Sequence, residues 1–259
     1  MLRFILIFIA HRGESIDTQE NTLESINLAW ERNADAVEID IRLTGDNKIV
    51  VIHDANTKRV SGVYNKVSSQ SMNELRKLNV GKYKGDYRDN VKIPSLEEVL
   101  DTVPANKKLF IEIKCGPEIL NPLRIELNES GLKSNQIKLM GFNFDTIKIA
   151  GNIFKEYGIL WLRIYGRNFL RYLKLNKDEI INIALKNEFE GLSFKYSKMI
   201  DHKFISLVKE SGLKIYVWTV NDIKTAEKLI DYGIDGIISD RPYWLKRQIY
   251  SKNSTSDLI

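Results

Sequence analysis

Two pairs of ionisable residues interrupt runs of apolar residues that otherwise have the composition of buried strands. Glu38 and Asp40 lie within residues 36–43, and Glu112 and Lys114 lie two positions apart at the end of another run. Residues two apart in a strand point to the same face. Burying an unpaired carboxylate costs several kcal/mol. We therefore expect these carboxylates to be paired, protonated or bound to a metal ion.

Histidines follow two further apolar runs. His11 follows residues 4–10, and His53 follows residues 49–52. Histidine is the side chain whose ordinary pKa lies nearest neutrality, so two of them at one centre favour a general acid and a general base. The third histidine, His202, begins a later helix, and we interpret it as a surface residue without a role.

The chemistry of the three carboxylates favours a hard divalent cation. Carboxylate oxygens without cysteine or additional histidine are typical ligands of Mg²⁺ or Ca²⁺, whereas zinc sites use histidine and cysteine. The structural alternative is an internal network of ion pairs through Arg12, Arg42 and Lys114. Several strands carry such residues toward one end of the predicted fold, and this favours a functional site.

The elements that must position these residues alternate along the chain, because short apolar runs are separated by amphipathic segments. Eight strands and their helices within about 250 residues predict an α/β fold, the (β/α)8 TIM barrel, with its chemistry at the carboxyl ends of the strands. A doubly wound sheet is the alternative, but no glycine-rich fingerprint follows the first strand. The expected strands are 4–10, 36–43, 109–114, 136–141, 158–163, 191–194, 214–219 and 235–239. The expected helices are 21–33, 72–78, 95–103, 117–130, 145–157, 177–187, 201–211 and 222–232, the last with Asn221 as a candidate N-cap.

One part of the chain does not follow this alternation. Residues 45–47 have turn chemistry and lead into residues 49–52, which predicts a hairpin after the second barrel strand. We assign residues 1–250 to a single barrel domain, which contains an insertion at about residues 44–94. Residues 251–259 are expected to form a flexible tail.

Composition sets the broad class. The 259 residues are 43% hydrophobic and 28% charged, which is ordinary for a globular protein. The single cysteine, Cys115, excludes an internal disulfide, and a reducing, cytoplasmic location is expected. The net charge of +5 (39 − 34) comes without a dense basic run, so no nucleic-acid partner is expected. The run 4–10 is too short for an integral membrane segment and is interpreted as a buried strand.

An ordered series of motifs from residue 9 to residue 242 resembles the glycerophosphodiester phosphodiesterase family. The motifs are Ala10-His11-Arg12-Gly13, Glu20-Asn21-Thr22, Val37-Glu38-Ile39-Asp40-Ile41, Ile52-His53-Asp54, Pro94-Ser95-Leu96-Glu97-Glu98, Glu112-Ile113-Lys114, Trp218-Thr219-Val220-Asn221 and Ser239-Asp240-Arg241-Pro242. The resemblance implies a (β/α)8 barrel that hydrolyses glycerophosphodiesters to glycerol 3-phosphate and an alcohol. Glu38, Asp40 and Glu112 would then hold one divalent cation, Mg²⁺ or Ca²⁺, and His11 and His53 would be the acid–base pair.

The same resemblance implies the residues that contact a small-molecule phosphodiester substrate. Arg12 and Lys114 would contact the phosphate, Trp218 would form an apolar wall, and Phe144 matches a phenylalanine at the mouth more loosely. The sequence departs from the family pattern at Gln19, where proline is usual, and at Asn47, where glycine is usual. Neither departure removes an ionisable position.

Two other functions compete with this interpretation. A phospholipase D of the same barrel type would cleave lysophospholipids, and it would require an apolar channel for an acyl chain beside the site. A catalytically inactive binding barrel would have lost at least one of the six residues His11, Glu38, Asp40, His53, Glu112 and Lys114. All six are present.

Overall fold

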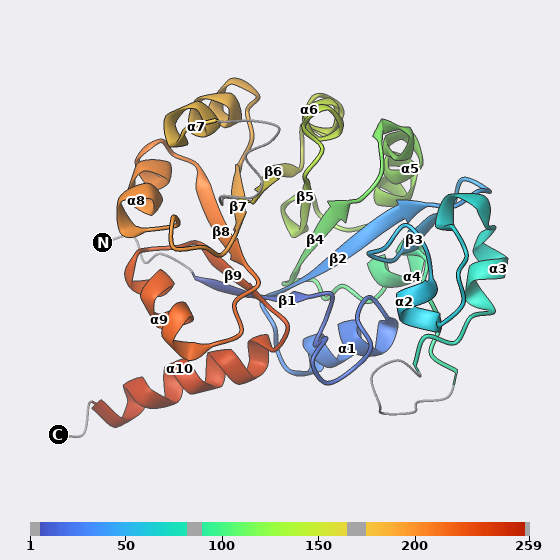
Figure 1. The fold of residues 1–259 in the computed structure, drawn as a ribbon, viewed down its shortest axis with the longest axis horizontal. Coiled ribbons are helices and arrows are strands. Elements are labelled where there is room, and N and C mark those ends of the chain that lie inside the picture. Colours follow the sequence, from blue (N-terminus) through green and yellow to red (C-terminus); the bar gives the residue numbers. More distant parts are fainter. Residues whose placement is uncertain (1–5, 82–89, 165–174, 257–259) are drawn as a thin grey trace.

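The computed structural model describes residues 6–81, 90–164 and 175–256 of the chain. Eight parallel strands close into a barrel in the order β1-β2-β4-β5-β6-β7-β8-β9, with β9 pairing back onto β1, and this confirms the expected (β/α)8 fold (Figure 1). The barrel strands are β1 (Ile7–His11), β2 (Ala36–Leu43), β4 (Lys108–Ile113), β5 (Ile137–Gly141), β6 (Gly158–Arg163), β7 (Gly191–Lys195), β8 (Lys214–Trp218) and β9 (Gly236–Ser239). Residues 4 and 5 of the expected first strand lie outside the described residues.

Helices cover the outside of the barrel, except those at residues 58–61 and 72–76, which lie in the segment inserted after the second barrel strand. They are α1 (Leu23–Glu31), α2 (Lys58–Ser61), α3 (Met72–Arg76), α4 (Leu96–Leu100), α5 (Leu120–Glu129), α6 (Phe144–Ile153), α7 (Lys177–Lys186), α8 (His202–Glu210), α9 (Ile223–Asp231) and α10 (Pro242–Ser256). Short 3₁₀ turns lie at Val67–Ser69, Pro117–Ile119 and Ser134–Gln136. Helix α10 was not among the expected helices, and it includes residues 251–256 of the expected tail.

The N-cap of α9 differs from the expectation. The side chain of Asp222, not that of Asn221, accepts the hydrogen bond from the backbone N–H of Thr225, at 2.8 Å. Asn and Asp cap helices about equally well, so local preference does not choose between neighbouring candidates. The side chain of Asn221 is instead bonded to the end of β9, as described below.

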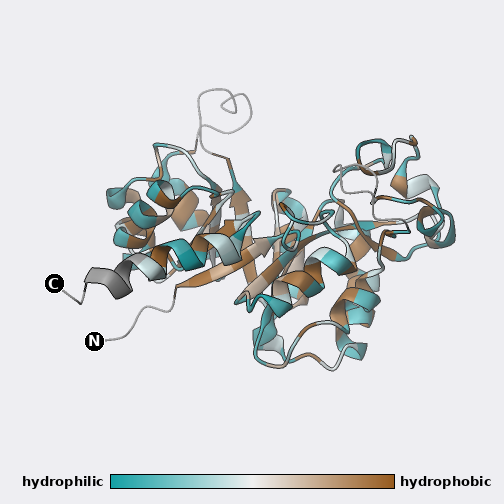
Figure 2. Cartoon of the chain, turned by 90° about the horizontal axis from the view of Figure 1, so that it is seen from below, coloured by the Kyte–Doolittle hydropathy of each residue, from teal (hydrophilic) through white to brown (hydrophobic). Residues whose placement is uncertain are grey.

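Each barrel strand buries both of its faces. On β4, Leu109 and Ile111 face outward into the core beneath the helices, while Phe110 faces the interior of the barrel. This two-sided burial is why the strands are nearly continuous apolar runs in the sequence. The apolar residues accordingly follow the strands and the inner sides of the helices in Figure 2.

The interior of the barrel is filled by side chains below the ionisable residues. The rings of Phe110 and Tyr216 meet edge to face with centroids 5.4 Å apart. A Cβ atom at Gly236 would lie 2.7 Å from the ring of Tyr216, so glycine is required for that ring to fit. At the amino ends of the strands, Glu190 pairs with both Lys138 and Lys214. The carboxylates singled out from the sequence lie toward the opposite, carboxyl ends of the strands.

The expected hairpin follows β2. Strand β3 (Ile49–Val51) pairs antiparallel with β2, and Asn47 in the turn adopts a positive φ of 57°. The segment after β3 carries α2 and α3 and has a small core of its own. This core consists of Val50, Ile52, Val60, Val67, Met72, Leu75, Val80, Val91 and Ile93. Within the part of the chain that the structure describes, no helix is both long and apolar enough to cross a lipid bilayer.

Candidate active site

Three buried carboxylates meet at the carboxyl ends of β2 and β4. The parallel register places Asp40 beside Glu112, and Glu38 lies two residues earlier on the same face of β2. One ligand oxygen from each residue can be chosen so that all three lie within 4.8 Å of one another. Burial, together with the negative charge of Asp40, raises the pKa of Glu112 to about 7 and that of Glu38 well above its usual range. The cluster therefore favours the binding of positive charge.

Two cationic side chains already compensate part of this charge. The Nε atom of Arg12 lies 3.0 Å from Oδ2 of Asp40, and the Nζ atom of Lys114 lies 2.7 Å from Oε1 of Glu112 and 3.4 Å from Oδ1 of Asp40. Burial alone would raise the pKa of Asp40, but the charges of Arg12 and Lys114 outweigh burial and lower it to about 2. Asp40 is therefore ionised, and the expected ion-pair network exists in part.

The turn that presents Arg12 has an unusual backbone. Arg12 has a φ of 58°, and Gly13 follows with a φ of 83°. A Cβ atom at Gly13 would lie 2.5 Å from backbone atoms of Ser25, so the close approach to α1 requires glycine. The turn also directs the N–H of Arg12 to Oε2 of Glu38, at 3.0 Å.

The carboxylate cluster fits a hard divalent cation. All of its ligand atoms are oxygens, and the set comes from two adjacent strands of a rigid barrel. Among the described residues, Oδ1 of Asp40 is buried and accepts no hydrogen bond. An ion at this position would satisfy that oxygen and reduce the repulsion that raises the pKa values of Glu38 and Glu112.

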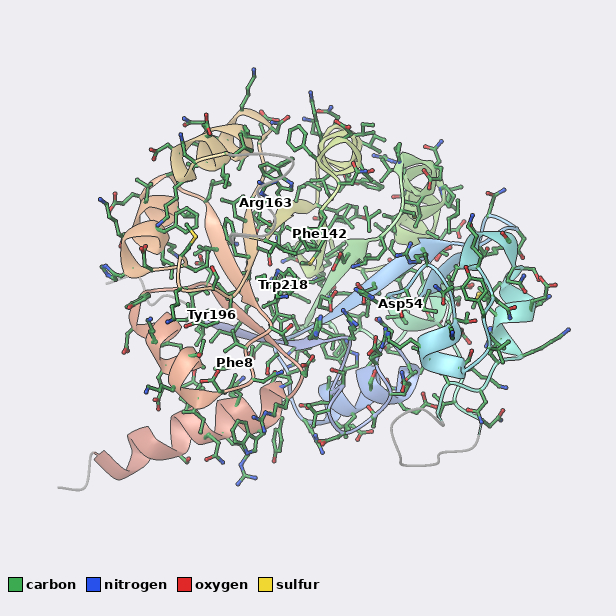
Figure 3. The ribbon with its side chains drawn as sticks, viewed as in Figure 1. Phe8, Asp54, Phe142, Arg163, Tyr196 and Trp218 are labelled. Carbon is green, nitrogen blue, oxygen red and sulfur yellow. The ribbon has the colours of Figure 1, made fainter. Side chains whose placement is uncertain are left out.

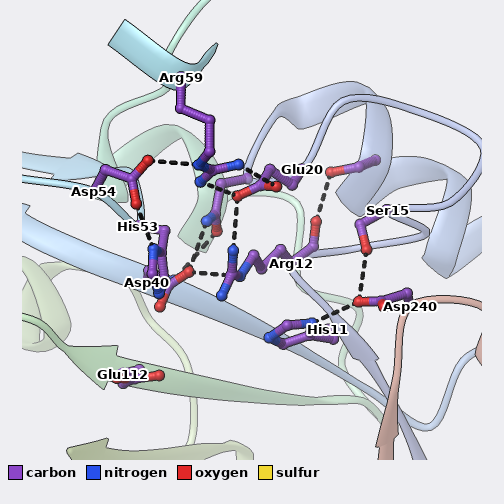
Figure 4. Close-up of polar contacts among 12 residues, drawn as sticks. His11, Arg12, Ser15, Glu20, Asp40, His53, Asp54, Arg59, Glu112 and Asp240 are labelled. Carbon is purple, nitrogen blue, oxygen red and sulfur yellow. Dashed lines mark hydrogen bonds and ion pairs between the residues drawn. The ribbon is translucent and has the colours of Figure 1, made fainter. Parts of the chain in front are cut away.

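Each of the two candidate catalytic histidines is bonded to an aspartate. The Nδ1 atom of His11 lies 2.6 Å from Oδ1 of Asp240, and the Nδ1 atom of His53 lies 2.7 Å from Oδ1 of Asp54 (Figure 4). Because Nδ1 is engaged in both rings, Nε2 is the nitrogen left for a substrate. The Nε2 atom of His11 lies 4.0 Å from Oε2 of Glu38, so this ring borders the carboxylate cluster.

Both histidines and Glu38 line a cavity of about 50 Å³. One side of it is ionisable and the other is apolar, and the rings of Phe142 and Trp218 meet edge to face on the apolar side with centroids 5.7 Å apart (Figure 3). The lining residues are His11, Arg12, Glu38, His53, Glu112, Lys114, Met140, Phe142, Leu162, Trp218 and Ile238. Eight of the nine residues singled out from the sequence thus lie in or beside one cavity, since Asp40 belongs to the cluster at its edge.

The ninth residue, Phe144, is not in the cavity. It begins α6 outside the barrel, where its ring packs 5.0 Å from Trp161 and 6.3 Å from Phe189 between ring centroids. Phe142 takes the place that we expected for Phe144. Met140 of β5 and Phe142, which follows the strand directly, both face the interior of the barrel. Strand alternation would place residue 144 on the same face as residue 142, so it does not separate the two. The available signal was Asn143, whose side chain accepts the hydrogen bond from the N–H of Thr146 at 3.0 Å and so begins α6 at Phe144.

Sequence reasoning missed several residues that hold the histidines and Arg12. Asn221 donates from Nδ2 to Oδ2 of Asp240 at 2.6 Å, and Arg59 donates from Nε to Oδ2 of Asp54 at 2.6 Å. Arg42, expected to pair with carboxylates, instead donates to the backbone carbonyls of His53 and Lys114, each at 2.9 Å. It therefore holds two strand ends together without neutralising the cluster.

The clustered carboxylates, the two cationic side chains and the two His–Asp pairs at the carboxyl end of this (β/α)8 barrel provide the charged and acid–base groups that hydrolysis of an anionic ester requires. Comparison with known proteins specifies the family. The profile of the glycerophosphoryl diester phosphodiesterase family matches residues 11–243. The chain belongs to this family, and it is a phosphodiesterase.

Individual relatives cover nearly the whole chain. A glycerophosphodiester phosphodiesterase of Caldanaerobacter subterraneus subsp. tengcongensis is 31% identical over 241 residues, which cover 91% of this chain and 94% of the relative. A lysophospholipase D of Homo sapiens is 24% identical, with 94% of this chain and 86% of the relative covered. The structure of an Oleispira antarctica phosphodiesterase in complex with its product sn-glycerol-3-phosphate superposes with a TM-score of 0.83 at 26% identity, covering 95% of this chain and 97% of that one.

Proposed function

We propose that this protein hydrolyses glycerophosphodiesters, such as glycerophosphocholine or glycerophosphoethanolamine, to glycerol 3-phosphate and an alcohol. The convergence of the His11–Asp240 and His53–Asp54 pairs on one cavity beside a carboxylate cluster carries this proposal. The glycerol 3-phosphate product bound to the Oleispira antarctica relative supports the same substrate class.

The two sides of the cavity match the two parts of such a substrate. A phosphodiester carries one negative charge, and its transition state places more charge on the equatorial oxygens. Arg12 and Lys114 provide the cations on the ionisable side, and the ring of Trp218 provides an apolar surface for the carbon skeleton of the glycerol or the head group. Positioned charge of this kind lowers the barrier because it needs no reorganisation during the reaction.

The two histidines would move the protons of the reaction. The Nε2 atom of one ring accepts a proton from the attacking hydroxyl, a new P–O bond forms, and the P–O bond to the departing alcohol breaks. The Nε2 atom of the other ring donates a proton to the departing oxygen. The attacking hydroxyl belongs either to water or to the neighbouring carbon of glycerol, in which case water opens the resulting cyclic phosphate in a second step. Asp240 and Asp54 fix the tautomer of each ring through Nδ1.

Glu38, Asp40 and Glu112 would hold the divalent cation, Mg²⁺ or Ca²⁺. When bound, the ion supplies positive charge to the phosphoryl oxygens. The three carboxylates would otherwise repel an anionic substrate, and Arg12 and Lys114 offset only part of their charge.

The test is a product assay on the purified protein with Mg²⁺ or Ca²⁺. Release of glycerol 3-phosphate from glycerophosphocholine supports the proposal, and the variant lacking both His11 and His53 is the control for contaminating activity. Lysophosphatidylcholine is assayed in parallel, because the human relative is named a lysophospholipase D. Production of lysophosphatidic acid without glycerol 3-phosphate would favour that activity, and the absence of both products would leave the inactive binding barrel.

A further inference from the structure

We propose that Arg59, which lies in the insertion and outside the catalytic cavity, is a positioning residue that sets both the phosphate contact Arg12 and the histidine His53. The kinetic effects expected of Arg59 rest on the proposed function, whereas its positioning of His53 does not. The inference goes beyond that function because it assigns to the insertion a part in building the site.

The geometry around Arg59 joins two loops of the barrel. Its NH1 and NH2 atoms donate to the two carboxylate oxygens of Glu20 at 2.9 and 2.8 Å, and its Nε atom donates to Oδ2 of Asp54 at 2.6 Å (Figure 4). Glu20 belongs to the loop between β1 and α1, and Asp54 follows β3. One guanidinium therefore uses its fork of donors to hold two carboxylates from different loops.

Each of these carboxylates continues to a residue of the site. Oε1 of Glu20 also accepts a hydrogen bond from NH1 of Arg12 at 2.8 Å, and Nε of Arg12 lies 3.0 Å from Asp40. Oδ1 of Asp54 lies 2.7 Å from Nδ1 of His53. Arg59 is thus one residue removed from Arg12 on one side and from His53 on the other.

The backbone at Arg59 is held in place by the packing of the insertion. The next residue, Val60, is 5% exposed and belongs to the small core of the insertion. The turn beyond α2 is closed by Gly62 with a φ of 78° and by the hydroxyl of Thr57, which donates to the carbonyl of Val63 at 2.6 Å. A side chain that starts from such a packed turn holds its partners with less loss of entropy than one on a free loop.

The charges explain why Arg59 matters to Arg12. Glu20 is 12% exposed and lies between two guanidiniums, and burial would raise its pKa, but the bonds from Arg59 and the charge of Arg12 lower it. Without Arg59, the ionised Glu20 would have Arg12 as its remaining cation. Glu20 would then draw Arg12 away from a bound phosphate, while Asp54 would lose the bond that fixes it beneath His53.

These two consequences predict a specific kinetic pattern. Arg59→Met should raise KM through Arg12 and lower kcat through His53, with kcat/KM reduced about 10- to 100-fold, as is usual when a supporting partner is removed. The double variant Glu20→Gln/Arg59→Met should have a KM closer to that of the wild type, because the carboxylate of Glu20 no longer competes with the phosphate for Arg12. Its kcat should stay low, because Asp54 still lacks the bond from Arg59. Arg59→Lys keeps one charge but lacks the fork, so it should fall between the wild type and Arg59→Met.

The matched control is Arg76→Met. Arg76 lies in α3 of the same insertion and pairs with Glu98, away from the cavity. A merely structural role for Arg59 predicts that Arg59→Met behaves like Arg76→Met, with a lower melting temperature and unchanged kinetic constants per folded molecule. That result would overturn the proposal. Arg59→Lys provides the test if Arg59→Met fails to fold.

A spectroscopic measurement separates this proposal from the proposed function. The chain has three histidines, so ¹⁵N-histidine labelling gives three imidazoles to follow by NMR. Arg59→Met should shift the signals of His53 and leave those of His11, which is bonded to Asp240, in place. If the wild type hydrolyses no glycerophosphodiester, the proposed function fails, and the His53 signals still decide whether Arg59 positions that ring. Unchanged His53 signals would refute the positioning role of Arg59.

Discussion

The Nδ1 atom of His11 lies 2.6 Å from Oδ1 of Asp240, a residue 229 positions further along the chain. The contact joins the ends of β1 and β9, the two strands that pair where the sheet returns to its start. Burial raises the pKa of Asp240, but its bond to His11 and those from Asn221 and Ser15 lower it to about 2. Asp240 is therefore ionised at neutral pH and fixes the Nδ1–H tautomer of His11.

We expect Asp240→Asn to lower kcat about 10- to 100-fold and to change KM little, because Asp240 does not line the cavity. The amide can donate to Nδ1 of His11 and so favour the wrong tautomer. Steady-state kinetics on glycerophosphocholine is the measurement. Asp201→Asn is the control, because Asp201 is the N-cap of α8 and asparagine caps equally well. Equal kcat values for the two variants would contradict the assigned role of Asp240.

Removal of the divalent cation should abolish hydrolysis. Chelation with EDTA should do so reversibly, and Glu38→Ala or Glu112→Ala should do so without unfolding the barrel, since each removes a ligand oxygen from the cluster. Calorimetric titration with Mg²⁺ and Ca²⁺ should show one site in the wild type and none in these variants. Glu97→Ala, an exposed change on α4, is the control. Full activity after dialysis against excess EDTA would contradict the metal assignment.

The stability of the metal-free protein should depend on pH through Glu112. Burial and the charge of Asp40 raise the pKa of Glu112 from 4.5 to about 7. A raised carboxyl pKa contributes stability that is complete below pH 4.5 and is lost as the pH rises through about 7. In EDTA, the wild type should therefore lose stability between pH 5 and 8, whereas Glu112→Gln should not. The melting temperature of the variant relative to that of the wild type should rise by about 2–4 °C for each kcal/mol of unfolding free energy that the wild type loses. A difference that stays constant with pH would contradict this pKa.

The positions of the elements were predictable from the sequence because buried parallel strands leave continuous apolar runs. The expected second strand at residues 36–43 coincides with β2, and the two-residue spacing of Glu38 and Asp40 placed both on its inward face. The meeting of β2 with Glu112 followed from the barrel, in which the carboxyl ends of adjacent strands converge.

Side-chain partners across the chain were not predictable in this way. Arg59 and Glu20 are 39 positions apart, and no periodicity connects them. The bond from Asn221 to Asp240 was not predictable either. The local sequence indicated only that Asn221 could cap a helix, and the bond to Asp240 depends on the tertiary structure. Phe144 was misplaced because the motif match indicated only a residue type, whereas its direction is decided by the end of β5 at Gly141 and the start of α6 after the N-cap Asn143.

Lys114 should act on the substrate and not only on its neighbour Glu112. If its ammonium group contacts the phosphoryl oxygens, Lys114→Met should lower kcat/KM about 10²- to 10³-fold, the usual loss for one contact to developing negative charge. Lys108→Met is the matched control, because Lys108 begins β4 at the opposite end of the barrel and Lys114 directly follows this strand. A variant that keeps its kinetics and loses only thermal stability would show that Lys114 is a structural partner of Glu112, at 2.7 Å.

The two histidines should be separable by the leaving group of the substrate. His11→Ala and His53→Ala should each reduce kcat/KM by orders of magnitude, and the double variant should lose little more, since both rings serve one proton-transfer cycle. An aryl phosphodiester has a leaving group that departs without protonation, so it should restore activity to the variant that lacks the general acid and leave the other variant inactive. Burial lowers the pKa of His53, and Arg12 and Lys114 reinforce this against the opposing charge of Asp40, so its neutral form should persist below pH 6.5. If His53 is the base, the acidic limb of the kcat/KM profile should accordingly lie below pH 6.5, and His11→Ala should be the variant that the aryl substrate rescues. Rescue of neither variant would show that one ring positions water or phosphate instead of transferring a proton.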